Sequence, residues 1–190
     1  MGDIIVNDID KSYGKVEVLR NFSAVFIQGE TYYIAGDSGK GKTTLLRILM
    51  GLEQIDSGEI IGLNSVKISV VFQEDRLIQS MNVLRNISFV SERLDTEIMR
   101  YLKIFGLEGF ERCKVEALSG GMKRRVAILR GLLCDSHLLL LDEPFKGLDD
   151  TIKSVVIEQV KTLSKGKTVI VTTHNQEEVK QLGIENHIVL

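Results

Sequence analysis

The chain has 190 residues, a formal net charge of −2 at pH 7, and 44% hydrophobic and 26% charged residues. These values predict one folded globular domain that buries most of a continuous core, and they exclude a disordered chain. The slightly acidic balance gives no overall attraction to a phosphodiester backbone, so we expect no nucleic-acid partner.

Targeting and membrane-spanning signals are not expected. The N-terminus, Met1-Gly2-Asp3, lacks a basic region followed by an apolar one, as a secretory signal would have. The longest purely aliphatic block, residues 138–141, is far shorter than the ~18 apolar residues of a membrane-spanning helix. Cys113 and Cys134 lack the spacing of metal ligands. We therefore expect a cytoplasmic protein with reduced cysteines, and if it works at a membrane, another chain spans it.

The N-terminal part of the chain changes from β-rich sequence to a strand, a glycine loop and a helix. Residues 3–9 are β-rich, and the alternation over residues 21–26 predicts a second strand, which favours an antiparallel β start. A strand is then predicted over residues 31–35 and a helix over residues 45–50, ending at Gly51. The glycine loop lies between these two elements.

Three later runs, residues 66–72, 138–141 and 168–172, are predicted as buried strands that alternate with helices, as a parallel sheet requires. Residues 74–118 are mainly helical in pattern, so we expect a single domain over 1–190 with a helical insertion at about 74–135. A last strand is expected over residues 187–190. The helix after Asp149 should pack on the sheet through Ile152, Val155, Val156, Val160 and Leu163. The predicted fold class is α/β, with a mainly parallel core sheet and an N-terminal antiparallel β part.

The glycine loop matches G-x-x-x-x-G-K-[ST] between a predicted strand and a predicted helix, the context that identifies a phosphate-binding loop of a P-loop NTPase. Its glycines let successive N–H groups converge on phosphate oxygens, and the helix dipole adds to the attraction. Lys42 is placed to neutralise phosphate charge, and the Thr43 hydroxyl is placed to ligate Mg²⁺. The pattern alone does not separate kinases, GTPases and ATPases. The nucleotide-binding residues expected here are Gly36, Asp37, Ser38, Gly39, Lys40, Gly41, Lys42, Thr43 and Thr44.

A second diagnostic segment, Leu118-Ser119-Gly120-Gly121-Met122, precedes a predicted helix. Here the sequence resembles the ATP-binding cassette (ABC) ATPases, whose signature is usually written LSGGQ. Met122 stands in place of the more frequent glutamine and leaves the serine and glycines intact. In the family these groups contact the γ-phosphate bound to the opposite subunit. The alternative is an ordinary N-capped helix with a glycine turn, and Ser119 would cap the helix in either case.

The third segment is the leucine run 138–141, which leads directly into Asp142, Glu143 and Pro144 and resembles the Walker B segment. The resemblance implies that Asp142 holds Mg²⁺, mostly through water, and that Glu143 orients and polarises the attacking water as general base. Paired acids at a buried strand end repel each other unless a cation is near. The alternative is a strand followed by a solvated acidic turn.

Four further residues match the family in the expected order along the chain. Gln73 resembles the glutamine that reaches Mg²⁺ and the water, and His174 resembles the switch histidine that hydrogen-bonds the γ-phosphate, although either residue alone is more often a solvated side chain. Asp149 matches the D-loop aspartate, and it also suits a helix N-cap. Tyr13 fits the aromatic residue that stacks on adenine, or it is a tyrosine at a strand end.

The resemblance covers residues 4–190 and implies an ABC ATPase fold and a Mg²⁺-dependent ATPase. Two subunits would sandwich two ATP molecules between phosphate loop and signature, on the inner face of a membrane, with a separate permease and a solute-binding protein as partners. Residues 71–77 and 142–145 look like importers of the nitrate, sulfonate and taurine type. No C-terminal regulatory domain is expected. Alternatives are a soluble ABC ATPase acting on ribosomes or DNA, and a nucleotide-gated regulatory module, which the intact Glu143 argues against.

Overall fold

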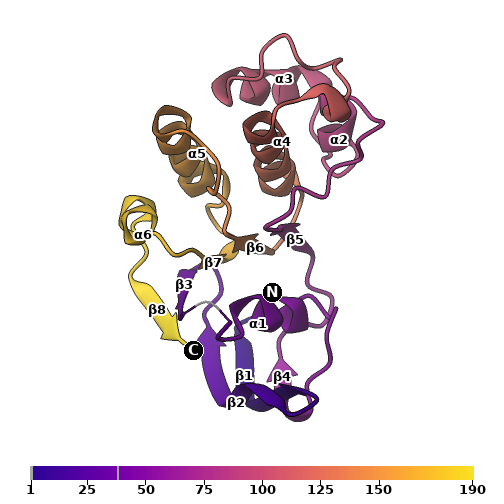
Figure 1. The fold of residues 1–190 in the computed structure, drawn as a ribbon. Coiled ribbons are helices and arrows are strands. Elements are labelled where there is room, and N and C mark those ends of the chain that lie inside the picture. Colours follow the sequence, from indigo (N-terminus) through magenta and orange to yellow (C-terminus); the bar gives the residue numbers. More distant parts are fainter. Residues whose placement is uncertain (1, 38) are drawn as a thin grey trace.

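The computed structural model describes residues 2–37 and 39–190, and it consists of two sheets and the helices packed on them (Figure 1). Ser38, which we expect in the phosphate loop, lies outside the described residues. The smaller sheet has the strand order β2-β1-β4 and is antiparallel. The larger sheet has the order β5-β6-β7-β3-β8 and is parallel throughout. The predicted α/β class with an antiparallel N-terminal part is confirmed.

The small sheet is formed by β1 (Ile4–Tyr13), β2 (Val16–Phe26) and β4 (Ser57–Ile61). β1 buries Ile4, Val6 and Ile9, and its register with β2 shifts three times. Such shifts strengthen the local twist of a strand, which lets the small sheet curve against the rest of the domain. The small sheet therefore covers one side of the α1 helix.

The large sheet contains β3 (Thr31–Ala35), β5 (Ile68–Val71), β6 (Leu138–Asp142), β7 (Thr168–Thr172) and β8 (Asn186–Val189). The leucine run of β6 is buried on both faces: Leu138 and Leu140 join one hydrophobic core, and Leu139 and Leu141 join the other. Because side chains alternate along a strand, four consecutive leucines require cover on both faces of the sheet. β6 is thus a central strand, and its carboxyl end carries Asp142.

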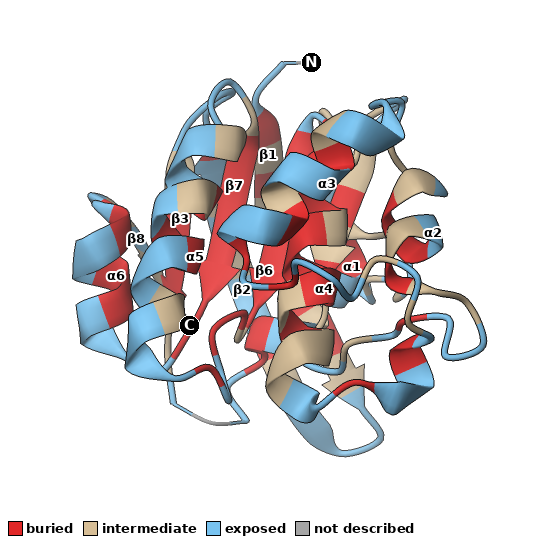
Figure 2. Cartoon of the chain, turned by 90° about the horizontal axis from the view of Figure 1, so that it is seen from above, coloured by how far each residue is buried: buried red, intermediate tan, exposed pale blue. Residues whose placement is uncertain are grey.

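Helices cover the two faces of the large sheet unequally (Figures 1 and 2). The helix α1 (Lys42–Leu49) lies between the large sheet and the small one, and α4 (Gly120–Leu133), α5 (Asp150–Leu163) and α6 (Gln176–Leu182) lie on the opposite face. Beyond α4 lie α2 (Val83–Ser88) and α3 (Asp95–Ile104), with a 3₁₀ turn, η1 (Val115–Ala117), before α4. The segment predicted as mainly helical contains α2, α3 and η1, joined by loops.

The buried face of α5 differs from the predicted stripe. Val156 and Val160 are buried as expected, and Ile157 is buried beside them, whereas Val155 is 37% exposed. Successive helical residues are rotated by about 100°, so a face centred on positions 156, 157 and 160 leaves position 155 at its flank. Within the described ranges, no helix is both long and apolar enough to cross a bilayer.

Candidate nucleotide-binding site

The phosphate loop connects the carboxyl end of β3 to the first residue of α1, Lys42. Gly41 is the N-cap of that helix, with φ 93°, and it provides no side-chain cap. A Cβ atom at Gly41 would lie 2.9 Å from both Cγ1 and the carbonyl oxygen of Val18, so only glycine fits beneath β2. The first N–H groups of α1 are therefore left for a ligand, and they attract an anion.

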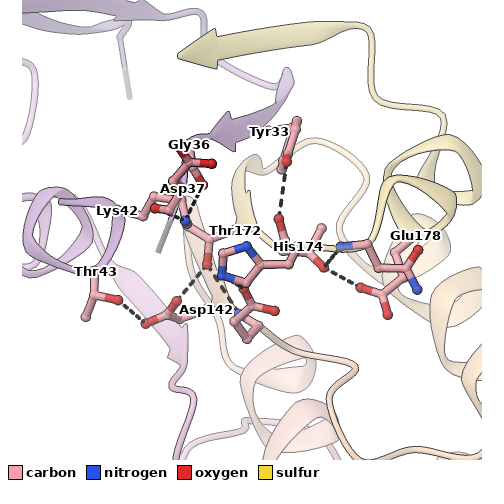
Figure 3. Close-up of polar contacts among 12 residues, drawn as sticks. Tyr33, Gly36, Asp37, Lys42, Thr43, Asp142, Thr172, His174 and Glu178 are labelled. Atoms are coloured by element: carbon pink, nitrogen blue, oxygen red, sulfur yellow. Dashed lines mark hydrogen bonds and ion pairs between the residues drawn. The ribbon is translucent and has the colours of Figure 1, made fainter. Parts of the chain in front are cut away.

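Lys42 is buried, and its ammonium group donates to the carbonyl oxygens of Gly36 at 2.5 Å and Asp37 at 2.9 Å (Figure 3). These two carbonyls hold the positive charge at the mouth of the loop. Among the described residues both partners of this buried ammonium are neutral carbonyls, and such a group keeps a strong preference for an anion. This geometry suits the neutralisation of phosphate oxygens that we expect of Lys42.

Asp142 is buried at the carboxyl end of β6, and each of its carboxylate oxygens has a hydroxyl partner (Figure 3). Thr43 Oγ1 donates to Oδ2 at 3.2 Å, and Thr172 Oγ1 donates to Oδ1 at 2.6 Å. A hydroxyl and a carboxylate oxygen are the hard donors that Mg²⁺ prefers, and Gln73 lines the same cavity with an amide oxygen. These residues fit the expected Mg²⁺ ligands Thr43, Gln73 and Asp142.

Glu143 follows Asp142 with a left-handed backbone, φ 47°. Its N–H group donates to the Thr172 carbonyl at 3.0 Å and lies 3.3 Å from the Thr172 hydroxyl. Its buried Oε1 lies 3.2 Å from His174 Nε2 and has no hydrogen-bond partner among the described residues. Burial raises the pKa of Glu143, and the neighbouring His174, through its ring and its backbone N–H group, opposes that rise. A partly desolvated carboxylate with a free oxygen is suited to accept a proton from water.

The phosphate loop, Asp142 and Glu143, and the segment that carries His174 line a cavity of about 1120 Å³. It contains most of the predicted site residues: Tyr13, Asp37, Gly39, Gly41, Lys42, Thr43, Thr44, Gln73, Asp142, Glu143 and His174. It also contains residues that the sequence did not indicate: Val18, Lys146, Thr173, Asn175, Gln176 and Glu178. Tyr13, which is 45% exposed, and Val18 both line the cavity, so part of its wall is aromatic and aliphatic.

Several predicted site residues do not line this cavity. Gly36 contributes through its carbonyl contact with Lys42, while Lys40 lines a separate groove between β2 and β8. Ser119 is the N-cap of α4, where its Oγ accepts the N–H of Met122 at 3.3 Å, and the predicted cap is confirmed. Gly120 and Gly121 follow in the first turn of α4. Asp149 caps α5 by accepting the Ile152 N–H at 3.0 Å.

A buried polar network supports the segment that carries His174. Thr173 Oγ1 donates to Glu178 Oε2 at 2.5 Å and accepts the Asn175 N–H at 3.1 Å, and the Tyr33 hydroxyl donates to the Thr173 carbonyl at 3.2 Å. Thr173 and Glu178 are both buried. The network fixes the turn between β7 and α6 and so sets where the His174 side chain begins. A glutamate on a short helix gave no sequence signal for this role.

A phosphate loop after one parallel strand, with carboxylates at the end of another, defines a P-loop nucleotide-binding protein. A family model described as "ABC transporter" matches residues 19–146. The chain therefore belongs to the ABC transporter family.

Relatives with curated names agree with this family. The chain is 35% identical over 97% of its length to the spermidine/putrescine import ATP-binding protein PotA of Mycoplasma capricolum. It is 36% identical, over 92% of its length, to the proteins of the same name from Clostridioides difficile and Treponema pallidum. The matched region is only 57%, 56% and 51% of these three relatives, so the chain spans little more than half of their length.

Proposed function

We propose that the chain binds ATP with Mg²⁺, hydrolyses it, and so energises transport of a solute through a separate membrane permease. The observation that carries the proposal is the single cavity that gathers Lys42, Thr43, Asp142, Glu143 and His174. Phosphoryl transfer to water needs positioning and charge stabilisation rather than a covalent intermediate. This cavity provides groups for both.

Each group has a role that follows from its contacts. Lys42 exchanges its two carbonyl partners for phosphate oxygens. Thr43, Gln73 and Asp142 would hold Mg²⁺, which would screen the phosphate charge. Glu143 Oε1, which has no hydrogen-bond partner in the described part of the chain, orients the attacking water and accepts its proton. His174, whose Nε2 lies 3.2 Å from Glu143 Oε1, donates to the γ-phosphate. Tyr13 stacks on adenine.

A second copy of the chain, or a similar subunit, completes each site. The signature residues 119–122 lie at the exposed start of α4 and do not line the cavity of their own chain. A capped helix start with two glycines presents N–H groups to an anion. Two chains arranged head to tail would place this start, and the D-loop Asp149, against the γ-phosphate in the partner. ATP would then hold the pair together until hydrolysis removes the shared anion.

A groove beside the nucleotide cavity supports a membrane partner. It shares Gln73, Thr43 and Asp142 with the cavity and extends along Leu46, Met50 and Leu52, of which Leu52 is 55% exposed. A permease segment seated there would sense the nucleotide through Gln73. We propose that the chain lies at the inner face of a membrane, with a solute-binding protein as a further partner. The names of the relatives support import as the direction of transport.

The domain boundaries and the solute remain proposals. We propose one nucleotide-binding domain over residues 1–190, with the helical insertion at about 74–135 supplied by α2, α3 and α4. The likeness to nitrate, sulfonate and taurine importers stays a prediction, and the relatives are named for spermidine and putrescine import. No observation favours the soluble, non-transport alternative.

Mixing two inactive variants tests the composite site. Lys42→Ala removes the ammonium group that would contact the phosphates, and Ser119→Arg blocks the signature segment. Each pure variant should therefore lose Mg²⁺-dependent ATPase activity. A mixed dimer contains one intact site, built from the Lys42 of one chain and the Ser119 of the other. The mixture should therefore recover activity, and a chain with both substitutions, mixed with Lys42→Ala, should recover none. Mixed dimers that form without activity would overturn the composite site.

A further inference from the structure

Arg124 is a buried cation whose contacts gather on two segments of the proposed site. It projects from the second turn of α4 and is only 4% exposed. Its guanidinium donates to carbonyl oxygens in the segment after β5, Phe72 at 2.5 Å and Gln73 at 3.3 Å. The other donors meet carbonyls at the end of β6 and just after it: Asp142 at 3.2 Å, Glu143 at 2.7 Å and Pro144 at 2.6 Å.

This arrangement uses the whole guanidinium fork. Arginine has five N–H donors in one plane and stays charged in proteins, and here five main-chain carbonyls and the Asp75 carboxylate, at 3.3 Å, surround it. A buried charge is tolerated only when it is paired and hydrogen-bonded. A side chain with fewer N–H donors cannot bond all of these carbonyls, so the segment after β5 or the segment at the end of β6 loses hydrogen bonds.

The backbone of Glu143 gives these contacts a consequence for the reaction. A non-glycine residue at φ 47° is strained and persists only when its surroundings hold it. The Thr172 carbonyl accepts the N–H group of Glu143, and Arg124 donates to the carbonyl oxygen of Glu143. The peptide groups before and after Glu143 are therefore both fixed. The same guanidinium fixes the carbonyl of Gln73. Through Arg124, α4 therefore sets the backbone positions from which the Gln73 and Glu143 side chains project.

We infer that Arg124 is a positioning residue for ATP hydrolysis, which couples the signature helix α4 to Gln73 and Glu143. This inference rests on the proposed function. A partner nucleotide that moves the start of α4 would shift the Arg124 fork, and the fork would move both segments together. Hydrolysis would thus depend on the state of the signature helix as well as on groups that touch ATP.

Arg124→Lys tests the inference because lysine keeps the charge and loses the planar fork. We expect kcat to fall at least about tenfold while KM and the affinity for a fluorescent ATP analogue stay within about threefold, since small misplacements lower kcat strongly. Arg124→Gln serves as a second variant without the buried charge. The matched control is Lys167→Gln, which removes another cation, a half-buried one, because Lys167 donates to the Leu132 and Cys134 carbonyls, away from both segments.

A purely structural role predicts different results. If Arg124 acts through Glu143, adding Arg124→Lys to Glu143→Gln should lower the residual kcat much less than it lowers the wild-type value. Equal losses in both backgrounds, a parallel loss of ATP affinity, or full activity of both Arg124 variants would overturn the inference. A wild-type chain that binds ATP but does not turn it over would overturn the proposed function and this inference with it.

Discussion

Asp142 and Glu143 are adjacent carboxylates with different surroundings. Two hydroxyl groups donate to Asp142, whereas Oε1 of Glu143 has no hydrogen-bond partner among the described residues and burial raises the pKa of Glu143. One carboxylate is thus held by hydroxyl donors where a cation would bind, and its neighbour is suited to take up a proton. Thr172 belongs to both environments, because its hydroxyl donates to Asp142 and lies near the Glu143 N–H group.

Thr172→Val tests what the Thr172 hydroxyl group contributes to magnesium binding and to stability. Valine keeps the shape of threonine in the fully buried end of β7 and removes the hydroxyl. We expect the Mg²⁺ concentration for half-maximal ATPase activity to rise, and the free energy of unfolding to fall by about 1–2 kcal/mol. A magnesium titration and urea unfolding measure the two changes. Thr162→Val, which removes an exposed hydroxyl on α5, is the control, and an unchanged magnesium midpoint would contradict the role of Thr172.

The helix α4 is the element on which most of the site depends. Its start carries the signature residues, Arg124 in its second turn reaches two site segments, and Gly131 in its last turn packs directly against β5. A Cβ atom at Gly131 would lie 2.6 Å from Val71 Cγ2. Because valine is stiff at χ1, neither partner can move away cheaply. The glycine therefore sets the distance between α4 and the sheet.

Gly131→Ala should accordingly destabilise the fold by about 1–3 kcal/mol, as overpacking of a core does. Val71→Ala makes room for the new methyl group, so the double variant should be less unstable than the sum of the two single variants. Urea unfolding measures all of them. Gly120→Ala is the control on the same helix, because an added Cβ there meets nothing within 4 Å. A sum of independent losses would contradict the contact.

At the scale of the molecule, the large sheet divides two hydrophobic cores and presents the site at the carboxyl ends of its strands. α1 with the small sheet fills one core, and the helices α2 to α6 fill the other. The phosphate loop belongs to the first layer and the signature to the second. A nucleotide bound at the sheet edge is therefore open to contact from a second molecule.

Glu143→Gln should trap an ATP-bound dimer, because binding is kept while the proton acceptor is lost. Size exclusion with Mg²⁺ and ATP should show a dimer, and omission of ATP should return the smaller species. Adding Lys42→Ala to the same chain should abolish the dimer. Wild-type turnover of the Glu143→Gln variant would remove Glu143 as the base.

The sequence alone determined the features that depend on neighbours along the chain. The phosphate loop follows from the spacing of its glycines and lysine, the buried strand β6 from four consecutive leucines, and the helix starts at Ser119 and Asp149 from their capping side chains. The mainly parallel sheet follows from the alternation of strands and helices. Each of these signals acts over a few residues, where backbone geometry and hydrophobic period decide the outcome.

The tertiary structure decided everything that depends on segments distant in sequence. Val18 beneath Gly41, Thr172 beside Asp142, and Arg124 between Gln73 and Glu143 join residues that no local pattern relates. The flank position of Val155 on α5 likewise depends on how that helix lies on the sheet. Hydrophobic periodicity indicates which residues of an element are buried. It does not indicate which other element buries them, because strand pairing and helix packing join segments distant in sequence.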